Sequence, residues 1–515
     1  MGLRFFNTMG RTMQDFKPIH SGFAGFYGCG PTVYNYAHIG NLRAYVCWDI
    51  LDRTLRFLGY DVKHVMNITD IGHLSGDDDD GEDKMVKQAE ARHQSVLEIA
   101  KFYTDAFLRD FDSLNIRRPD VICKATEHVD DMIALIKQIE ANGHTYMAGG
   151  NLYYDITTYP DYGKLANLQL DEQIAGAGRR NVVVVDENKR NPHDFVLWFT
   201  KSKFENQALT WDSPWGRGYP GWHIECSAMS MKYLGRHFDI HTGGIDHIPI
   251  HHTNEIAQSE GAFSAEERSE GAWVNYWLHN EFLILEGGKM SKSSGHFITL
   301  QTDLPAEKGF SLKSKGFSPL DYRFFLLGGH YRKPLVFSES AMESAKNSRE
   351  ALVQRAAKVL KAAGGKATES KCEIISYEKA KSDLSEKASS LLEQFKNAME
   401  NDLAAPKALS LLQKAVKDSS IEPAEALKLI SVMDGVLALG VIESASEALK
   451  AQEAKTSANN HEGDAEAAEI EALIAERKEA KKARDFARAD TIRAELTERG
   501  IEITDTPDGT VWIRK

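Results

Sequence analysis

The order of hydrophobic and polar residues near the start of the chain predicts a strand, a helix and a second strand. Residues 23–29 form a short apolar run that ends in a Gly-Pro turn, which is typical of a buried strand. From about 40 to 59 the apolar residues recur every three or four positions, which indicates one apolar face of an α-helix. Residues 61–69 then alternate as a strand does. This β-loop-α-β order is the repeating unit of a parallel sheet.

Further along the chain, the patterns predict an insertion and then a helical region. We expect amphipathic helices at about 85–115 and 126–143, followed by short strands with many turns at 144–205. From Glu339 onward almost every segment has helical periodicity. The stretch 442–465 is rich in Ala, Ser and Glu, from which we expect a flexible linker before a compact tail.

Length and composition narrow the classes of protein that fit. With 515 residues, 42% of them hydrophobic and 27% charged, the chain has room for about three or four folded domains and does not resemble a disordered protein. It has no signal segment and no apolar run of about 18 residues, so we expect a cytoplasmic protein with no membrane span. Five cysteines are odd in number and too few for a disulfide framework.

The net charge of −13 argues against a protein that coats DNA, because a polyanion would be repelled. The charge is unevenly spread. Residues 477–515 contain ten Lys or Arg and eight Asp or Glu, a net charge of +2, so the first 476 residues carry −15. The composition of the tail fits a solvated amphipathic helix pair nearly as well as a small helical domain that binds nucleic acid, with Arg, Lys and Trp512 available for phosphate contact or base stacking.

The loop before the first predicted helix contains His38-Ile39-Gly40-Asn41. It lies at the carboxyl end of a predicted strand and opens a helix, where free N–H groups bind anionic ligands in open α/β sheets. Gly40 allows close approach to the backbone, and His38 and Asn41 can donate hydrogen bonds to phosphate oxygens. By itself, such a tetrapeptide is more often an ordinary capped helix start.

A second basic motif follows roughly 250 residues later. Lys289-Met290-Ser291-Lys292-Ser293 lies between glycines, which predicts an exposed loop with two ammonium groups. Two lysines three residues apart can neutralise charge that develops on a transferring phosphate group. A single basic run of this kind is usually only a solvated loop. The two motifs together, in this order, favour a nucleotide site.

Cysteine and histidine positions indicate a metal site. His251 and Glu255 are four residues apart and share one face if they lie on a helix. Together with Cys226 and Cys29 they would supply two thiolates, an imidazole and a carboxylate, a donor set suited to zinc. Each cysteine taken singly is more often a core residue. Spacing does not exclude four other histidines, namely His237, His241, His247 and His252.

These motifs resemble those of the cysteine–tRNA ligase family, one of the class I aminoacyl-tRNA synthetase families, over nearly the whole chain. The matching segments, in chain order, are FNT, YGCGPTVYNYAHIGNLRAYV, NITDI, KRNPHDFVLW, SPWGRGYPGWHIECSAMSM, HFDIHTGG, HHTNEIAQSE, VNYWLH, GGKMSKSSG, HYRKPLVFS and RKEAKKARDFARADTIRAELTERGI. Several of them are long and specific, far beyond a chance tetrapeptide.

The resemblance implies an α/β fold, with a Rossmann-like parallel-sheet catalytic domain that contains an insertion, followed by an α-helical region and a small C-terminal domain. The expected parts are 1–120 and 206–278 (split catalytic domain), 121–205 (insertion or connective domain), 279–338 (junction that carries the KMSKS loop), 339–441 (helical bundle), 442–465 (flexible linker) and 466–515 (anticodon-binding domain).

The resemblance also implies the site residues. The ATP site would comprise His38, Gly40, Asn41, Lys289, Met290, Ser291, Lys292 and Ser293, and of these His38, Asn41, Lys289 and Lys292 would be catalytic. One zinc ion per subunit would be held by Cys29, Cys226, His251 and Glu255. Thr69, Trp222 and His241 resemble the residues around the bound cysteine. Mg²⁺ would accompany ATP.

Three departures from the family pattern stand out. Asn41 replaces a frequent histidine and can still hydrogen-bond phosphate, although it never carries charge. Thr253 replaces a common glutamate, which changes no proposed metal ligand. The run Asp77 to Asp80 lengthens the NITDI segment, and we assign it no role beyond that of a solvated acidic loop.

The implied activity is ATP-dependent ligation of L-cysteine to tRNA(Cys) through a cysteinyl-adenylate, by a protein that we expect to be a monomer without DNA or membrane partners. We hypothesise that zinc selects the substrate thiolate, because an apolar pocket separates near-isosteric substrates such as cysteine and serine by only about 10- to 200-fold. A closed, purely structural zinc site is the alternative. Two alternative functions are a cysteine:amino-sugar ligase on the same scaffold and a non-catalytic tRNA-binding paralogue.

Overall fold

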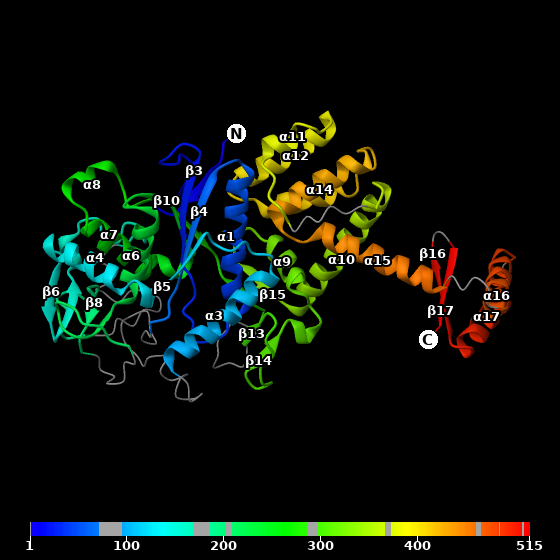
Figure 1. The fold of residues 1–515 in the computed structure, drawn as a ribbon, viewed down its shortest axis with the longest axis horizontal. Coiled ribbons are helices and arrows are strands. Elements are labelled where there is room, and N and C mark those ends of the chain that lie inside the picture. Colours follow the sequence, from blue (N-terminus) through cyan, green and yellow to red (C-terminus); the bar gives the residue numbers. More distant parts are fainter. Residues whose placement is uncertain are drawn as a thin grey trace.

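A five-stranded parallel sheet lies at the centre of the first half of the chain (Figure 1). Its strands are β3 (Phe23–Gly28), β4 (Asp61–Ile68), β5 (Val121–Lys124), β10 (Phe238–Gly244) and β11 (Val274–Asn280), in the spatial order β11-β10-β3-β4-β5. Counted along the chain, this is the order 3-2-1-4-5 of a doubly wound nucleotide-binding sheet. The order reverses between β3 and β10, so a ligand crevice is expected where these two strands end.

The computed structural model describes residues 2–71, 95–168, 186–201, 209–286, 297–365, 372–459, 465–483, 485–506 and 509–514. Within them, no helix is long and apolar enough to cross a membrane.

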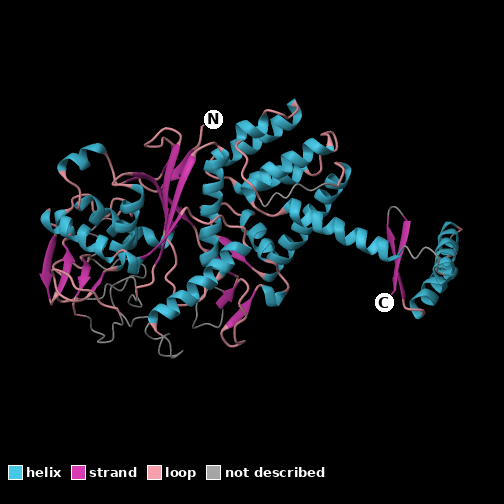
Figure 2. Ribbon diagram, in the orientation of Figure 1, coloured by secondary structure: helices cyan, strands magenta, loops and turns pink. Residues whose placement is uncertain are grey.

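Helices cover both faces of the sheet, as Figures 1 and 2 show. Helix α1 (Ile39–Phe57) packs on one face, against β4 and β10, and α3 (Val96–Ser113) follows on the same side. Helix α6 (Trp222–Leu234) packs on the other face against β3 and β4, and α4 (Val129–Ala141) and α7 (Thr253–Gly261) pack against α6. The short helix α8 (Ala265–Glu270) comes next. The predicted strand-helix-strand opening and the parallel sheet are confirmed.

The apolar stripe predicted for α1 is buried as expected. Leu42, Val46, Ile50 and Leu55 are at most 3% exposed. The helix begins at a reciprocal cap, in which the His38 side chain accepts from the backbone N–H of Asn41 and the Asn41 side chain accepts from that of His38. The tetrapeptide is therefore a capped helix start, as such a sequence most often is. The cap holds the side chains of His38 and Asn41 on the side of the sheet where β3 ends.

The insertion forms a separate antiparallel sheet. Its strands are β6 (Thr145–Ala148), β7 (Asn151–Tyr154), β8 (Phe195–Phe199) and β9 (Tyr219–Pro220), in that order. The expected boundaries of 121–205 differ from this arrangement at both ends. Strand β5, at 121–124, pairs with β4 in the central sheet, and β9 completes the inserted sheet from beyond residue 205.

Small two-stranded sheets connect the sheet domain to the helical region. A β1 (Arg4–Asn7) and β2 (Thr12–Asp15) hairpin lies beside β11. In the junction, β12 (Leu283–Leu285) pairs in parallel with β15 (Leu335–Phe337), and β13 (Phe297–Thr299) pairs in parallel with β14 (Gly309–Ser311). Helix α9 (Pro319–Leu327) lies between β14 and β15 in the chain.

The helical region is confirmed, but the expected linker after it is not. The helices are α10 (Glu339–Ala362), α11 (Tyr377–Lys381), α12 (Glu386–Glu400), α13 (Ala405–Ala415), α14 (Pro423–Leu437) and α15 (Val441–Asn459). Most of the predicted flexible linker 442–465 is thus part of α15. Ile442, Ala445 and Leu449 recur at helical spacing, are at most 9% exposed and lie on the helix that packs against α10.

The tail folds as an α/β unit around its own core. Helices α16 (Ala465–Lys482) and α17 (Phe486–Glu498) pack together, and β16 (Ile501–Thr506) and β17 (Gly509–Arg514) form a hairpin. The core residues are Ile470, Ile474, Ile492, Leu496, Ile501, Ile503 and Trp512. The hairpin was not expected from the sequence, and the expected availability of Trp512 is wrong, because Trp512 is 3% exposed and its indole N–H donates to Glu471 at 2.8 Å.

Candidate functional site

The nucleotide motif and the flanks of the basic motif meet at the start of α1. The His38 ring lies edge-on to the ring of Phe297 with centroids 5.7 Å apart. A side chain added at Gly40 would lie 3.9 Å from the Cβ of Leu283. Leu283 begins β12 and Phe297 begins β13, so the strands on either side of 287–296 both pack at this helix start. Lys289, Met290, Ser291, Lys292 and Ser293 lie outside the described residues.

This helix start is suited to anions. It stands at the carboxyl edge of the sheet next to the point where the strand order reverses, and unpaired N–H groups at a helix N-terminus carry partial positive charge. Arg43, one turn further along α1, is buried and adds a cation to the same helix. The arrangement can bind a phosphate-bearing ligand against His38, Gly40 and Asn41.

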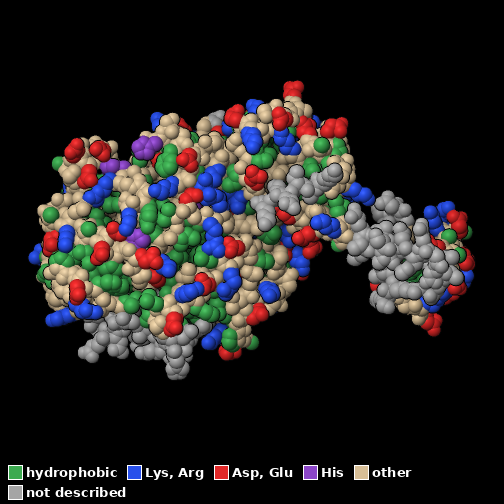
Figure 3. All heavy atoms as spheres, in the orientation of Figure 1, with side chains coloured by type: hydrophobic (Ala, Val, Ile, Leu, Met, Phe, Trp, Pro, Cys, Tyr) green, Lys and Arg blue, Asp and Glu red, His purple; other side chains and the backbone are tan. Residues whose placement is uncertain are grey.

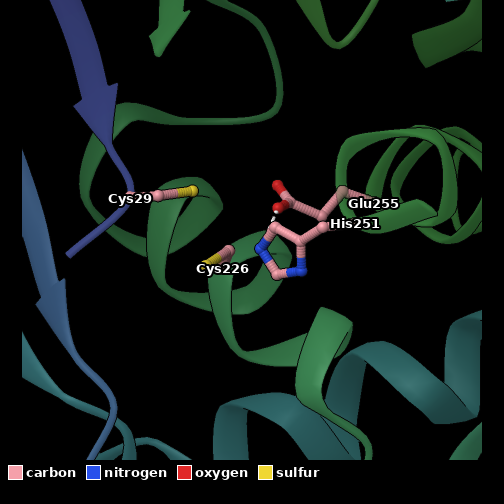
Figure 4. A group of neighbouring side chains, drawn as sticks. All are labelled: Cys29, Cys226, His251 and Glu255. Atoms are coloured by element: carbon pink, nitrogen blue, oxygen red, sulfur yellow. Dashed lines mark ion pairs between the residues drawn. The ribbon is translucent and has the colours of Figure 1, made fainter. Parts of the chain in front are cut away.

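The four predicted metal ligands converge, as Figure 4 shows. Cys29 follows β3, Cys226 is on α6, His251 is in a π-helical turn at Ile248–His252, and Glu255 is on α7. One donor atom from each lies within 4.8 Å of the donor atoms of the other three. Residues from both halves of the sheet domain thus form one cluster beside the end of β3.

The loop that carries Cys29 is held in place by a glycine. A Cβ at Gly30 would lie 1.7 Å from the backbone oxygen of Asn67, at the end of β4. The Gly30 N–H donates to the Asn67 side chain at 2.7 Å, and the Cys29 N–H donates to the Thr242 carbonyl at 3.3 Å. Only glycine permits this approach, which fixes Cys29 between β4 and β10.

Electrostatic pairing couples the charges of the cluster residues. Burial raises the pKa of the Glu255 carboxyl, but His241 and His251 outweigh it and hold that pKa at about 2. Burial lowers the pKa of His251, but Glu255 and Cys226 outweigh it and raise that pKa to about 10. Burial raises the pKa of the Cys29 thiol well above its usual range, whereas a hydrogen bond from Cys29 lowers the pKa of Cys226. Of the two sulfurs, that of Cys226 therefore loses its proton more readily.

These donors fit a zinc ion. The 2.7 Å ion pair between Glu255 Oε1 and His251 Nε2 lacks hydrogen-bond geometry, so this buried oxygen has no donor among the described residues. Sulfur, imidazole nitrogen and carboxylate oxygen together are the ligand types that zinc takes in proteins. Cys29 is only partly buried, whereas Cys226, His251 and Glu255 are fully buried. Among these four residues, Cys29 is the one that keeps some solvent exposure.

Of the competing histidines, His241, His247 and His252 lie close to the cluster, and the His247 ring is 5.1 Å from that of His251 between centroids, although His247 belongs to neither ligand set. Cys29, His241, His252 and Glu255 also have donor atoms within 4.8 Å of one another, so a second, overlapping ligand set exists. His252 has its Nδ1 atom 2.8 Å from His279 and its Nε2 atom 3.4 Å from the sulfur of Cys29, so the nitrogen that faces the cluster is the one a metal would use and the second set stays open. His237 contacts the carbonyl of Ala272 at 2.8 Å instead and belongs to neither set.

Of the three residues expected around the substrate, Trp222 and His241 contact the cluster, and Thr69 bonds to Glu225, the neighbour of Cys226 in the chain. The Trp222 ring lies against that of His251 with centroids 4.3 Å apart, and it is partly exposed. His241 contacts Glu255 Oε2 at 2.7 Å. The Thr69 hydroxyl donates to the buried carboxylate of Glu225, on α6, at 2.9 Å. A small ligand beside Cys29 would meet the partly exposed Trp222.

Two histidines in this region were missed by sequence reasoning. The Nδ1 atoms of His223 and His251 lie 2.9 Å apart, and His279 connects His252 to the hydroxyl of Thr8. For His223 a signal existed, since it lies three residues before Cys226 and therefore on the same helical face. For His279, on a strand far along the chain, only the fold reveals the contact.

Comparisons with known proteins give matches over nearly the whole chain. The family model "tRNA synthetases class I (C) catalytic domain" matches residues 15–347, and "Cysteinyl-tRNA ligase anticodon binding domain" matches 464–512. The cysteine–tRNA ligase of Treponema denticola is 56% identical over 522 residues, and that of Treponema pallidum strain Nichols 46% identical over 536. These matches cover 99% of both chains in the first case and 100% of both in the second.

Solved structures show the same fold at low identity. A Mycobacterium tuberculosis methionyl-tRNA synthetase has a TM-score of 0.51 at 15% identity, over 82% of this chain and 92% of that one. An Agrobacterium radiobacter LeuRS has a TM-score of 0.53 at 12% identity, over 85% of this chain and 86% of that one. These two likenesses support the α/β architecture.

Proposed function

The chain belongs to the cysteine–tRNA ligase family, and we propose that Cys29, Cys226, His251 and Glu255 hold the zinc ion with which it selects cysteine. The protein is a ligase that uses ATP with Mg²⁺ to join L-cysteine to tRNA. The observation that carries the zinc proposal is the convergence of these four donors, from distant parts of the chain, next to the crevice at the end of β3.

The first chemical step forms an adenylate. A carboxylate oxygen of cysteine attacks the α-phosphorus of ATP, and pyrophosphate leaves. Catalysis of such a step is mostly positioning and charge stabilisation. We assign His38, Gly40 and Asn41 to the phosphates, because they stand at the N-terminus of α1. Lys289 and Lys292 are proposed to neutralise the charge that develops on the phosphates, with Met290, Ser291 and Ser293 completing their loop.

The second step transfers the amino acid. A ribose hydroxyl at the tRNA 3′ end attacks the carbonyl carbon of the adenylate, and AMP leaves. We place the cysteinyl group beside Cys29, between Thr69, Trp222 and His241, because Cys29 keeps some solvent exposure and Trp222 and His241 contact the cluster. In this position the cysteinyl group would lie between the proposed metal ligands and the start of α1, where we assign the phosphates.

A zinc ion at the cluster would supply a preference for thiolate over hydroxyl ligands, which is the difference between cysteine and serine. The matching test uses the protein with and without metal. We expect chelation to weaken cysteine binding strongly and to bring the preference over serine close to the 10- to 200-fold of a pocket without metal. Undiminished cysteine affinity and selectivity in the zinc-free protein would support a closed structural site instead.

We further propose that the tail contacts the tRNA anticodon, with Phe486 as its exposed aromatic side chain. Phe486 begins α17 and is 63% exposed, the largest exposure among the exposed large apolar side chains of the described residues. Arg488 is nearby on the same helix, and Lys481 and Lys482 end α16. An aromatic ring next to cations is the usual means of holding an unstacked base.

Deleting 465–515 tests this role. We expect aminoacylation of tRNA(Cys) to fall far more than cysteine-dependent exchange of pyrophosphate into ATP. Equal losses would argue against a tRNA-binding tail. The same charging assay with an amino-sugar acceptor addresses the alternative ligase, which the match of an anticodon-binding model to 464–512 does not favour.

Three further expectations are kept as proposals. The division of the chain follows the predicted boundaries, with β5 moved to the catalytic domain, β9 moved to the insertion and 442–459 moved to the helical region. A monomer is expected, and sedimentation analysis would check it. The location in the cytoplasm is expected from the sequence alone.

A further inference from the structure

Arg43 is a buried cation with neutral partners. It lies on α1, is 2% exposed, and forms no ion pair with any residue in the described part of the chain. Its guanidinium donates instead to backbone carbonyls, those of Phe282 and of Lys333, the latter at 2.6 Å. Longer contacts reach the carbonyls of His330 at 3.4 Å and Tyr331 at 3.5 Å. A buried guanidinium held only by carbonyls is unusual, because burying a charge is costly unless a counter-charge compensates it.

The carbonyls belong to two segments that are far apart in sequence. Phe282 immediately precedes β12, and residues 330–333 lead into β15. These two strands pair in parallel, with Ile284 opposite Val336. The planar fork of one guanidinium thus fixes the beginnings of both strands on α1 at once, which a single-point donor cannot do.

This attachment lies next to the helix start that binds the phosphates. Arg43 is five residues after His38, a separation of about 7.5 Å along a helix. Leu283, the residue after Phe282, stands near enough to Gly40 that a Cβ added there would lie 3.9 Å from the Leu283 Cβ. The spacing between α1 and β12 therefore depends on Arg43 at the point where β12 passes the nucleotide motif.

The other side of the 330–333 segment is held by the helical region. Asp402, in the turn between α12 and α13, accepts from the Tyr331 hydroxyl and from Arg332 Nε, both at 2.6 Å. It adopts a left-handed backbone conformation, with φ of 57°, that a non-glycine residue rarely takes. Residues 330–333 are thus clamped between Arg43 on α1 and Asp402 in the helical region.

We propose that Arg43 is a positioning residue for adenylate formation, which sets β12 and β15 against the phosphate-binding start of α1. The inference rests on the proposed ATP site at His38, Gly40 and Asn41. Arg43 touches none of the reacting atoms and acts through the backbone of its two partner segments. Its guanidinium geometry, rather than its charge alone, carries the role.

Arg43→Lys separates geometry from charge, since lysine keeps the cation and loses the fork. We expect kcat/KM for ATP in pyrophosphate exchange to fall by about 10- to 100-fold, the scale on which misplaced catalytic groups lose rate. Cysteine affinity, measured by equilibrium binding, should stay within about twofold of wild type, because Cys29 and its partners are untouched. In Arg43→Ala, added methylguanidinium should restore part of the exchange rate.

Arg53→Lys is the matched control. Arg53 is on the same helix, is 5% exposed, and also donates to backbone carbonyls, those of Asn115, Cys372 and Gly435, away from β12 and β15. Because Arg53 also pairs with the buried Asp49, its change should lower the melting temperature at least as much as Arg43→Lys does, while the ATP parameters of the folded protein stay normal. If the Arg43 variants do not fold, Asp402→Asn loosens the same segment from its other side and should show a smaller ATP-specific loss.

Three results would overturn the proposal: Arg43→Lys with normal ATP kinetics, equal losses for ATP and cysteine, or an ATP-specific loss of the same size in Arg53→Lys. Failure of the proposed ATP site would look different, since His38→Ala would then leave exchange intact. In that case wild-type exchange and the Arg43 result would have to be explained by another nucleotide site.

Discussion

Glu255 connects the proposed metal ligands to their surroundings, since one of its oxygens faces His251 and the other faces His241, each at 2.7 Å. Glu255→Gln keeps the size and removes the charge. We expect zinc affinity to fall by about 10- to 100-fold, as losses around metal sites commonly do, and the KM for cysteine to rise with it. Competition with a chromophoric chelator measures the first effect.

Glu266→Gln is a suitable control for this change. Glu266 is exposed on α8 and contacts none of the four proposed ligands. It should leave zinc affinity and cysteine KM unchanged. Normal zinc affinity in Glu255→Gln would remove Glu255 from the ligand set and favour a set built on the neighbouring histidines.

The two aromatic residues of the tail allow a paired prediction. Phe486→Ala removes an exposed ring, so the melting temperature should be unchanged while the KM for tRNA rises by about 5- to 100-fold, the range for loss of one stacked base. Trp512→Ala opens the small core and breaks the hydrogen bond to Glu471, so the tail should unfold.

Circular dichroism of the isolated tail, together with charging kinetics of the full protein, distinguishes these outcomes. An unchanged tRNA KM in Phe486→Ala would mean that this ring does not touch the tRNA. A stable tail in Trp512→Ala would mean that the other core residues suffice without it.

For single residues, the sequence predicts well which side chains belong to the site and less well which partners they contact. Cys29, Cys226, His251 and Glu255 were recognisable because their motifs are distinctive, and their convergence agrees with the expectation. Trp512 was misassigned because basic neighbours suggest RNA contact, whereas alternation along β17 turns this residue toward the core. The pairing of His252 with His279 joins distant segments and leaves no local pattern.

Helix α1 combines the nucleotide motif with a buried ionic network, which gives it a characteristic response to acid. Asp52 pairs with Arg56 at 2.7 Å and with His64 at 3.5 Å. Burial raises the pKa of Asp52, but the neighbouring His64 and the hydrogen-bonded Arg56 outweigh it and bring that pKa to about 2. Because the folded pKa is below the unfolded value, this stabilisation is present above pH 4 and is lost as the pH falls toward 2.

Asp52→Asn should therefore destabilise the protein by about 2 kcal/mol at neutral pH, and the difference from wild type should shrink between about pH 4 and pH 2. Urea unfolding at a series of pH values checks this. Asp61→Asn, at the exposed start of β4, is the control and should leave the free energy of unfolding at neutral pH unchanged. If the difference in the free energy of unfolding between Asp52→Asn and wild type stays constant down to pH 2, the low pKa does not belong to this carboxyl.

Among elements, local periodicity identified α1, β3, β4 and the long helices, because each buries one regular face. The pairing of β12 with β15 was not predictable, since it joins strands about fifty residues apart through backbone contacts. Helix α15 was mistaken for a linker because its composition is polar. Three apolar residues at helical spacing were enough for packing on α10.

The whole molecule consists of a broad body and a small tail unit at the far end of α15 (Figure 1). A helix of 19 residues spans about 28 Å, so α15 acts as a spacer as well as a packing element. On the face drawn in Figure 3, acidic and basic side chains are interspersed over the body, with no extended field of one sign. The position of the tail, more than bulk charge, should therefore determine where the tRNA is held.

Ala451→Pro tests the spacer. Ala451 is exposed within α15, and proline removes a backbone donor there and kinks the helix. We expect kcat/KM for tRNA in charging to fall by about 10-fold or more, because the tail is moved relative to the adenylate site. Cysteine-dependent pyrophosphate exchange should remain within about twofold of wild type.

Ala451→Ser is the control, since serine changes the side chain without breaking the helix, and it should charge tRNA normally. Normal charging in Ala451→Pro would show that the tail finds the tRNA without help from a rigid α15. A parallel drop in pyrophosphate exchange would indicate that the kink disturbs the body instead.

Cys29 and Cys226 give the enzyme an unusual relation to its own accuracy. Both thiols enter a new copy of the protein from cysteinyl-tRNA, the product of the reaction that the existing copies catalyse. A copy that charged serine would place serine at some of these codons, and a hydroxyl is a poor substitute for a thiolate as a zinc ligand. The next copies would then discriminate less well. Errors in translation at two codons would thus be amplified from one generation of the enzyme to the next.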